Sequence, residues 1–243
     1  MSLVATHDRA AHRGLVTVCV MLATIMQALD TSIANVALPH MQGSLSASQD
    51  QISWVLTSYI VAAAVATPLT GWLAGRYGRK RLFLGSVIGF TIASVFCGLA
   101  GSINQMVFFR FLQGICGAAL VPLAQTMLLN IYPREKAGSA MAIWGAAVML
   151  GPIIGPTLGG WLTDTYNWRW VFYINVPIGA VAIAALWVFA KETPHYRRSF
   201  DFFGFAMLSI AKPKKSKPRR CVWLSRAKLA STTKARTPIG TLM

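Results

Sequence analysis

Six long apolar segments dominate this chain between Gly14 and Ala190. A helix of about 20 residues crosses the roughly 30 Å hydrocarbon core of a bilayer, so each segment predicts a transmembrane helix. Only 12% of the residues are charged, against about 25% in an average soluble domain. We therefore expect an all-α membrane protein built as a six-transmembrane-helix bundle. The segments are Gly14–Leu38, Ser53–Leu73, Leu82–Gly101, Gln105–Asn130, Gly138–Leu162 and Trp170–Ala190.

Basic residues in the connecting segments predict how the bundle is oriented. On one side lie eleven Lys and Arg residues, and on the other side lies only Arg169. Because cytoplasmic loops carry the excess of Lys and Arg, we expect both ends of the bundle to be cytoplasmic, in the inner (plasma) membrane. The eleven are Arg9, Arg13, Arg76, Arg79, Lys80, Arg81, Arg134, Lys136, Lys191, Arg197 and Arg198.

The pattern divides the chain into four parts. Residues 1–13 form a short cytoplasmic N-terminus, and residues 14–190 form the bundle. Residues 191–211 form a linker and the start of a seventh helix that is too short to cross. Residues 212–243 hold ten of the 23 Lys and Arg residues and no acidic residue, which predicts a disordered basic tail. We favour a tail without a partner over one that binds anionic lipid or nucleic acid, so nucleic acid is not an expected partner.

Asp30 is a carboxylate within the first apolar segment, with Gln27, Thr31 and Asn35 nearby. A charged Asp at mid-helix costs about 2.5–3.5 kcal/mol on insertion scales. An ionisable residue in such a place indicates a functional site, in which it pairs with a cation or faces a wet cavity. We predict a proton- or substrate-coupling role for Asp30, with Gln27 and Asn35 beside it. The alternative is that Asp30 only stabilises helix packing through hydrogen bonds.

Arg110 is a cation early in the fourth apolar segment. It shares one helix face with Gln113 and Gly114, at spacings of three and four residues. This pattern predicts the wall of a polar cavity, and we add Arg110 and Gln113 to the coupling residues. The alternative is that Arg110 extends to the outer membrane surface. If Arg110 approaches Asp30, substrate or proton binding competes with that ion pair.

Glycines recur every four residues in the fifth segment, at Gly151, Gly155 and Gly159. Small residues at this spacing allow another helix to approach closely. Pro152 and Pro156 each remove a helical hydrogen bond and favour a bend. Such a helix suits a moving gate or a tight seal, although ordinary helix packing would produce the same contact.

The segment Gly71–Leu84 connects the second and third predicted helices. Gly75 and Gly78 predict a tight turn there, and four basic residues follow or flank it. The simplest interpretation of these charges is membrane orientation alone.

The sequence contains no pattern that is typical of an enzyme active site. The four cysteines and four histidines are scattered and form no metal-ligand pattern. Phosphate-binding loops and nucleophile elbows are also missing from the sequence. We expect no enzyme, no metal site and no cofactor, with a proton gradient as the energy source.

Several segments, in this order, resemble the major facilitator superfamily, and specifically its fourteen-helix drug:proton antiporters of the EmrB/QacA type. They cover about Ala28–Gly179. The segments are LDTSIANVALP in the first helix, GWLAGRYGRKRLFL after the second, RFLQGICGAA in the fourth, GPIIGPTLGG in the fifth and WRWVFYINVPIG at the start of the sixth.

The resemblance implies one half of a major facilitator fold and proton-coupled export of small hydrophobic or amphipathic compounds by alternating access. It implies that Asp30 is the proton or substrate carboxylate and that Arg110 is its relay partner. The residues that it assigns to an antiporter motif are Gly151, Pro152, Gly155, Pro156, Gly159 and Gly160. The residues of the conformational-switch loop are Gly71, Arg76, Gly78, Arg79 and Lys80.

Two departures from the family pattern qualify these expectations. Gly75 stands where the loop motif usually has an acidic residue, and such transporters are about twice as long as this chain. We therefore expect a truncated N-terminal fragment, ended by truncation or a reading-frame change, with little transport of its own. Expected partners are the lipid bilayer, a substrate, and either a second copy or a separate C-terminal half. The alternative function is a non-transporting remnant or a helix-packing partner subunit.

Overall fold

The computed structural model describes residues 2–189, with side chains described for residues 14–188. The predicted linker (191–211) and basic tail (212–243) lie outside the described residues. Six helices among those described are long and apolar enough to cross a membrane, which confirms the all-α, six-span prediction. The helices are α1 (Ser2–Ser44), α2 (Gln49–Tyr77), α3 (Arg79–Leu99), α4 (Ile103–Gly117), α5 (Leu120–Ile131), the 3-10 turn η1 (Arg134–Lys136), α6 (Ala137–Thr165), α7 (Trp170–Tyr173) and α8 (Asn175–Phe189).

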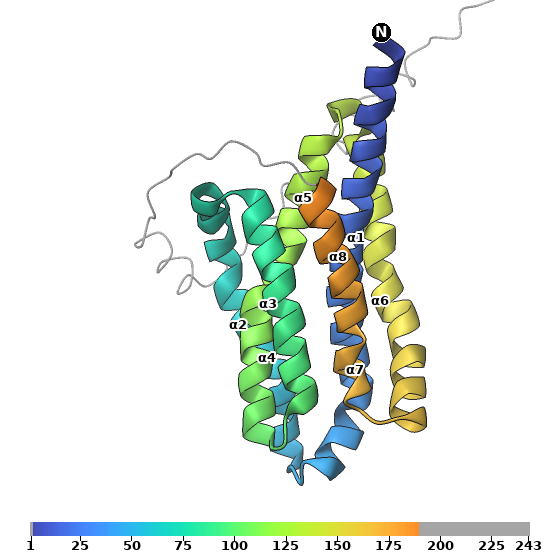
Figure 1. Cartoon of the computed structure of the whole chain (residues 1–243). Coiled ribbons are helices and arrows are strands. Elements are labelled where there is room, and N and C mark those ends of the chain that lie inside the picture. Colours follow the sequence, from blue (N-terminus) through green and yellow to red (C-terminus); the bar gives the residue numbers. More distant parts are fainter. Residues whose placement is uncertain (1, 190–243) are drawn as a thin grey trace, which may run out of the picture. The chain divides into compact units, whose positions relative to one another are not determined.

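Helix α1 lies at the centre of the described bundle. Figure 1 shows it between α6 and α8, and both of these helices pack along it. Helices α2, α3 and α4 form the neighbouring group, in which α4 contacts both α2 and α3. Any side chain on α1 that points toward α4 is therefore enclosed by helices.

Two helix ends differ from the sequence prediction. We expected the first helix to end at Leu38, before Pro39, but α1 continues through Pro39 to Ser44. Proline removes its own N–H bond, yet the following turn still closes, because Leu45 N–H donates to the Met41 carbonyl at 2.9 Å. Helix α2 begins four residues before the predicted Ser53. Its start is set by a capping box in which Ser48 and Gln51 bond each other's backbone N–H groups.

The fourth and sixth candidate membrane spans are each built from two helices with a break between them. The fourth is divided between α4 and α5 at Ala118, and the sixth between α7 and α8 at Ile174. A proline follows each break in the first turn of the new helix, Pro122 in α5 and Pro177 in α8. Each proline lacks the N–H that would bond the carbonyl four residues earlier, so the interruptions have a local cause.

The described core consists of two apolar clusters, one in each half of the bundle. The first apolar cluster lies toward the end where α1 begins and includes Val20, Met26, Phe83, Phe90, Leu120 and Leu186. The second apolar cluster lies toward the opposite end and includes Leu29, Ile33, Val55, Cys97, Met106 and Phe172.

Buried polar residues occupy the level between these clusters. In α1, Asp30 follows Met26 of the first cluster and Leu29 of the second. In α3, Ser94 lies between Phe90 of the first cluster and Cys97 of the second. The helices therefore pass from one apolar cluster to the other through a shared polar layer.

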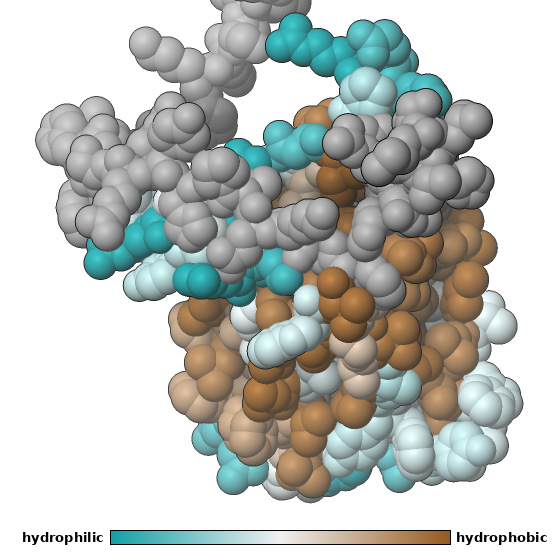
Figure 2. Space-filling view, turned by 45° about the horizontal axis from the view of Figure 1, so that its top comes forward, coloured by the Kyte–Doolittle hydropathy of each residue, from teal (hydrophilic) through white to brown (hydrophobic). Residues whose placement is uncertain are grey.

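Large apolar side chains cover much of the outside of the bundle. Helix α6 exposes Ile153 (69%) and Met149 (59%), and α2 exposes Val65 (60%). Figure 2 shows hydrophobic residues over much of the visible side and strongly hydrophilic ones gathered toward one end. Apolar patches of this extent suit contact with lipid or with another helical unit.

The glycine ridge of α6 permits the close packing of this helix on α1. A Cβ added at Gly151 would lie 2.6 Å from the Ala28 Cβ, and one at Gly155 would lie 2.5 Å from the Ser32 Cβ. Gly160, on another face of the same helix, has nothing within 4 Å of that position.

We predict that Gly155→Ala destabilises the chain by about 1–3 kcal/mol, because the added methyl overpacks the α1–α6 contact. Gly160→Ala is the matched control, and it should leave stability unchanged or raise it slightly. Unfolding of the two variants in detergent micelles measures the difference. Equal stability of the two variants would contradict the close contact.

Candidate functional site

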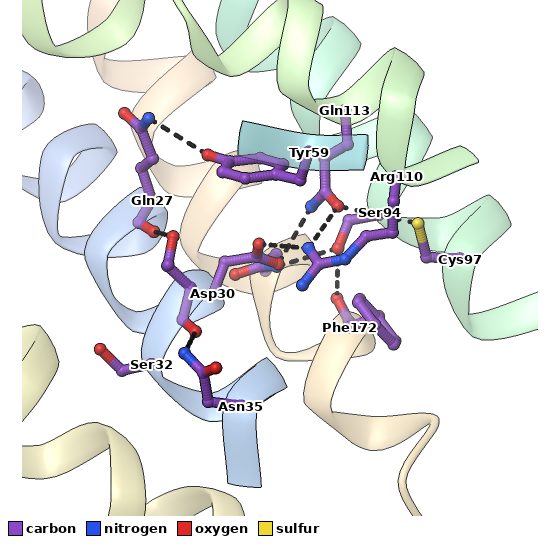
Figure 3. A network of polar contacts seen from close by, with 12 residues as sticks. Gln27, Asp30, Ser32, Asn35, Tyr59, Ser94, Cys97, Arg110, Gln113 and Phe172 are labelled. Carbon is purple, nitrogen blue, oxygen red and sulfur yellow. Dashed lines mark hydrogen bonds and ion pairs between the residues drawn. The ribbon is translucent and has the colours of Figure 1, made fainter. Parts of the chain in front are cut away.

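Asp30 and Arg110 form an ion pair at the centre of the bundle. The Arg110 Nη1 donates to the Asp30 Oδ2 at 2.7 Å, and their side chains are 1% and 0% exposed, respectively. Figure 3 shows the two side chains converging from α1 and α4. Of the two interpretations that the sequence left open for Arg110, the structure shows the one inside the bundle, in which Arg110 meets Asp30 and does not extend to the membrane surface.

Gln113 joins this pair from the next turn of α4. Its Nε2 donates to the Asp30 Oδ1 at 3.0 Å, and its Oε1 accepts a bond from the Arg110 Nη1 at 2.8 Å. The Cys97 thiol of α3 lies 3.7 Å from the same Oε1. Gln113 thus bridges the two charged groups and holds their relative position.

Two further residues, Asn175 and Ser94, complete the site from helices α8 and α3. The Asn175 Nδ2 donates to the Asp30 Oδ1 at 2.6 Å and to the Ser94 Oγ at 2.9 Å. The Ser94 hydroxyl in turn donates to the Phe172 carbonyl at 2.9 Å. Three N–H donors therefore surround Asp30, an arrangement that matches an ionised carboxylate.

Aromatic rings enclose the Arg110 guanidinium. Its central carbon lies 5.3 Å from the centre of the Tyr59 ring and 5.0 Å from that of Phe172. Rings at this distance attract a cation, and more strongly where water is excluded. The Arg110 cation is thus stabilised by the Asp30 carboxylate, the Gln113 amide oxygen and two ring faces.

Gln27 and Asn35, the other predicted coupling residues, do not touch Asp30. Gln27 donates to the Tyr59 hydroxyl at 3.2 Å, so it contacts the site through that ring. Asn35 is exposed and donates to the Thr31 carbonyl of its own helix at 2.9 Å. Asn35 lies five positions after Asp30, which places the two side chains on different faces of a helix with 3.6 residues per turn.

The predicted antiporter motif faces in two directions. Gly151, Gly155 and Gly159 are buried against α1, whereas Pro152 and Pro156 are exposed. Gly151 lies against Ala28 and Gly155 against Ser32, which places the ridge on the same stretch of α1 as Asp30. A change in the α1–α6 contact would therefore move the backbone that carries the carboxylate.

The predicted switch loop is shorter than expected. Gly71, Gly75 and Arg76 lie inside α2, so the expected two-glycine turn is wrong and Gly78 alone makes the reversal, at φ 89°. Uninterrupted hydrogen bonding in α2 explains this, since glycine lowers helix stability by only about 1 kcal/mol. Gly78 N–H still donates to the Ala74 carbonyl at 3.1 Å.

The basic residues of the switch loop make their own contacts. The Arg76 guanidinium lies 5.5 Å from the Trp72 ring centre. The Lys80 Nζ donates to the Trp187 carbonyl in the last turn of α8 at 3.2 Å, where a cation compensates the helix dipole. Lys80 thereby connects the start of α3 to the end of α8.

Asn175, Ser94, Tyr59 and Phe172 are the site residues that sequence reasoning missed. Asn175 lies within WRWVFYINVPIG, and an amide just inside an apolar segment is a signal that could have identified it. Ser94 carries no comparable signal, because small hydroxyl residues commonly bond their own helix backbone. Among the described residues, no group of three His, Cys, Asp or Glu side chains could hold a metal ion.

Comparison with known proteins places this site in a family. The sequence profile of the Major Facilitator Superfamily matches residues 20–232. The chain belongs to the Major Facilitator Superfamily. It is a family of transporters, and the match therefore points to a transporter rather than an enzyme.

Two relatives of this superfamily member are a multidrug export protein and a fatty acid resistance protein. The chain is 49% identical over 198 residues to the multidrug export protein EmrB of Escherichia coli (strain K12), covering 81% of this chain and 39% of that protein. It is 43% identical over 204 residues to the fatty acid resistance protein FarB of Neisseria gonorrhoeae, covering 83% of this chain and 40% of that protein. The chain thus spans about 40% of the length of these curated relatives.

Solved structures show the same superfamily fold. The proton:xylose symporter XylE bound to 6-bromo-6-deoxy-D-glucose superimposes with a TM-score of 0.68 at 15% identity, over 76% of this chain and 46% of that one. An inward-open form of XylE from E. coli gives 0.65 over 93% of this chain and 57% of that one. The likeness establishes the fold.

We predict that Asp30→Asn destabilises the protein by about 3–5 kcal/mol, because it leaves Arg110 buried without a counter-charge. The double variant Asp30→Asn/Arg110→Gln should lose less than the sum of the two single losses. Unfolding in detergent micelles measures each value.

The exposed His40–Asp164 pair, with 3.7 Å between Nε2 and Oδ1, provides the control. Asp164→Asn should change stability little, since exposed pairs contribute little. A double variant at positions 30 and 110 that loses the full sum would contradict a coupled buried pair.

We also predict that Gly78→Ala destabilises the α2–α3 reversal by about 1–3 kcal/mol, because its positive φ strains any residue with a Cβ. Gly71→Ala, where an added Cβ has nothing within 4 Å, should not. The same unfolding measurement compares them, and equal values would contradict a turn made by Gly78 alone.

Proposed function

We propose that this chain supplies the N-terminal half of a proton-coupled multidrug exporter. The observation that carries the proposal is the fully buried Asp30–Arg110 pair, enclosed by α1, α3, α4 and α8 between two apolar clusters. Charges are expensive in such a place, and in membrane proteins they commonly mark proton or substrate pathways.

Proton coupling follows from competition for the Asp30 carboxylate. While Asp30 is ionised, Arg110, Gln113 and Asn175 all donate to it. A proton on Asp30 removes the charge that balances Arg110, so the pair loosens and the helices that carry it gain a second arrangement. Proton binding and helix movement are then linked, as alternating access requires.

The proposed substrate is a small hydrophobic or amphipathic compound. The names of the relatives, a multidrug export protein and a fatty acid resistance protein, favour this class. An apolar groove of about 570 Å³ between α2 and α4, lined by aromatic residues such as Trp54, Phe108 and Phe111, is consistent with it.

The proposed location is the inner (plasma) membrane with both ends of the bundle in the cytoplasm. Arg79 and Lys80 at the α2–α3 reversal, and Arg134 and Lys136 in η1, lie at connections on the side where α1 begins. Arg169 is the basic residue at the opposite side, where its Nη1 donates to the Ala100 carbonyl at 2.8 Å. The excess favours a cytoplasmic location for the first side.

A second bundle completes the proposed exporter. Substrate sites in such transporters lie between two repeats, and this chain spans about 40% of its relatives. The second bundle is either another copy of the chain or a separate C-terminal half. The exposed apolar side chains of α6 also favour an alternative function, a non-transporting partner subunit that assembles through this helix.

The test is export of a fluorescent hydrophobic cation from cells. We expect residues 1–243 alone to give little export, and co-expression with the C-terminal portion of the E. coli relative to give export that an uncoupler abolishes. Asp30→Asn should reduce that export to background, whereas Asn35→Ala should not.

Two outcomes would contradict the proposal. Export that an uncoupler does not reduce would contradict proton coupling. Strong uncoupler-sensitive export by residues 1–243 alone would contradict the need for a second bundle. Membrane insertion without export in any combination would favour the partner-subunit alternative. Immunoblotting of membranes controls for insertion of each variant.

A further inference from the structure

We propose that Asn175 is a positioning residue whose side-chain amide turns over when Asp30 gains or loses a proton, and thereby passes the protonation state of Asp30 to Ser94 and the α7–α8 break. This role rests on the proposed proton-coupled function, because a change in the protonation of Asp30 is what drives the amide. It adds a moving part on the sixth span to the α1–α4 ion pair.

The two ends of the Asn175 amide have unequal surroundings. Asn175 is 0% exposed, and its Nδ2 donates to the Asp30 Oδ1 at 2.6 Å and to the Ser94 Oγ at 2.9 Å. Its Oδ1 is buried and, within residues 14–188, has no hydrogen-bond partner. Buried polar atoms are nearly always bonded, so an unpartnered amide oxygen calls for an explanation.

An ionised Asp30 accounts for the orientation of the amide. A carboxylate accepts hydrogen bonds and has none to donate, so the amide must present its NH₂ group and leave its oxygen without a partner. The Asn175 Oδ1 therefore lacks a partner because Asp30 is ionised. When Asp30 is protonated, the same oxygen can accept a hydrogen bond from its carboxyl group.

A proton on the Asp30 Oδ1 reverses these requirements. The new O–H faces the Nε2 of Gln113 and the Nδ2 of Asn175, which are both donors. The Gln113 Oε1 already accepts from Arg110 at 2.8 Å and from the Cys97 thiol at 3.7 Å, which occupies both of its lone pairs. Of the two amides that donate to Asp30, Asn175 is the one whose oxygen has no partner among the described residues, and half a turn of its amide brings that oxygen to the carboxyl O–H. The proton comes from water, and only hydrogen bonds are exchanged around it.

Rotation of the amide also changes the bonds of Ser94. In the ionised state Ser94 accepts from the Asn175 Nδ2 and donates to the Phe172 carbonyl at 2.9 Å. After rotation Ser94 faces the Asn175 Oδ1, an acceptor that competes with the Phe172 carbonyl for the hydroxyl proton. Proton binding thereby weakens the contact between α3 and α7.

Phe172 connects the altered Ser94 bond to the Asp30–Arg110 pair. Its ring lies 5.0 Å from the Arg110 guanidinium, and its residue precedes the break at Ile174 by two positions. Pro177 has already removed the backbone bond across that break. The α7–α8 junction is therefore a place where a small change in side-chain bonding moves an aromatic ring against a buried cation.

Few other titratable or charged groups face Asp30. Arg110 approaches it from α4, the Tyr59 hydroxyl lies near it on α2, and the Cys97 thiol lies on α3. Helices α5 and α8 contain no titratable residue, and α7 contains only Tyr173. The titratable residue of α6, Asp164, pairs with His40, ten residues and about 15 Å along α1 from Asp30.

Infrared difference spectroscopy of the full chain in lipid vesicles, between alkaline and acidic buffer, tests this role. Two bands are followed: the C=O band of protonated Asp30, and the amide C=O band of asparagine, edited with ¹³C-asparagine. The double variant Asp30→Asn/Arg110→Gln, which leaves no buried charge unpaired, assigns the first band by its loss.

In the wild-type chain we expect both bands to change between the two buffers. In Asn175→Ala the Asp30 band should shift to higher frequency, because the carboxyl O–H loses its acceptor, and the asparagine change should be lost. Asn35→Ala is the matched control, since the Asn35 amide donates to the carbonyl of Thr31 in its own helix. It should alter neither result.

Three outcomes would overturn the proposal. They are an Asp30 band at the same frequency in the wild type and Asn175→Ala, an asparagine change that survives Asn175→Ala, and no Asp30 band in either buffer. A merely structural Asn175 would lower stability without moving these bands.

Asn175→Asp is the second variant if Asn175→Ala fails to insert, because it keeps the size of the side chain. Two carboxyl groups beside one arginine cannot both remain ionised. We expect this variant to show a protonated carboxyl band in the alkaline buffer, in which the wild type shows none. Absence of that band would place position 175 away from Asp30.

The spectra need no transport, so they separate this role from the proposed function. If the expected band changes occur but no assembly exports the dye, the exporter function is contradicted and the role of the Asn175 amide is retained. If export occurs but the bands are the same in the wild type and Asn175→Ala, the role of the amide is contradicted and the exporter function is retained.

Discussion

The Asp30–Arg110 pair is the interaction on which the arrangement of the bundle depends. Two charges in an apolar interior are tolerated when each faces the other and polar groups bond the pair. Gln113 of α4 and Asn175 of α8 donate to Asp30, and Ser94 of α3 accepts a bond from Asn175. Four of the spans must therefore keep a common register at one depth, and the two apolar clusters on either side are separated by that shared polar layer.

Close helix packing makes this polar layer responsive to movement elsewhere. The ridge of Gly151, Gly155 and Gly159 brings the α6 backbone against Ala28, Ser32 and Ile33, on both sides of Asp30. With so little space between α1 and α6, displacement of one helix must displace the other. On the opposite side of α1, the interrupted sixth span provides a junction at Ile174 with a missing backbone bond. The Asp30 carboxylate therefore lies between the close α1–α6 contact on one side and the α7–α8 break on the other.

Sequence reasoning succeeded where the signal is local or periodic. Apolar length alone predicted six spans, and the glycine spacing predicted the close contact that Gly151 and Gly155 make with α1. It failed where tertiary context decides a local choice. Pro39 does not end α1, and Gly75 does not form a turn, because the surrounding helix bonds outweigh a single unfavourable residue. Asn35 was grouped with Asp30 by nearness in sequence, yet helical geometry turns it away.

By itself the sequence determined the membrane-spanning class, the number of spans and the two charged side chains, Asp30 and Arg110, that lie within apolar segments. Hydrophobic length and the cost of a buried charge are properties that a single segment already has. Only the tertiary structure decided which partners Asp30 takes. Arg110, Gln113 and Asn175 lie 80, 83 and 145 positions from it along the chain. Their convergence depends on how whole helices pack, a relation that no local pattern contains. The same packing left the Asn175 side-chain oxygen without a hydrogen-bond partner among the described residues, which is the observation behind the proposed role of that amide.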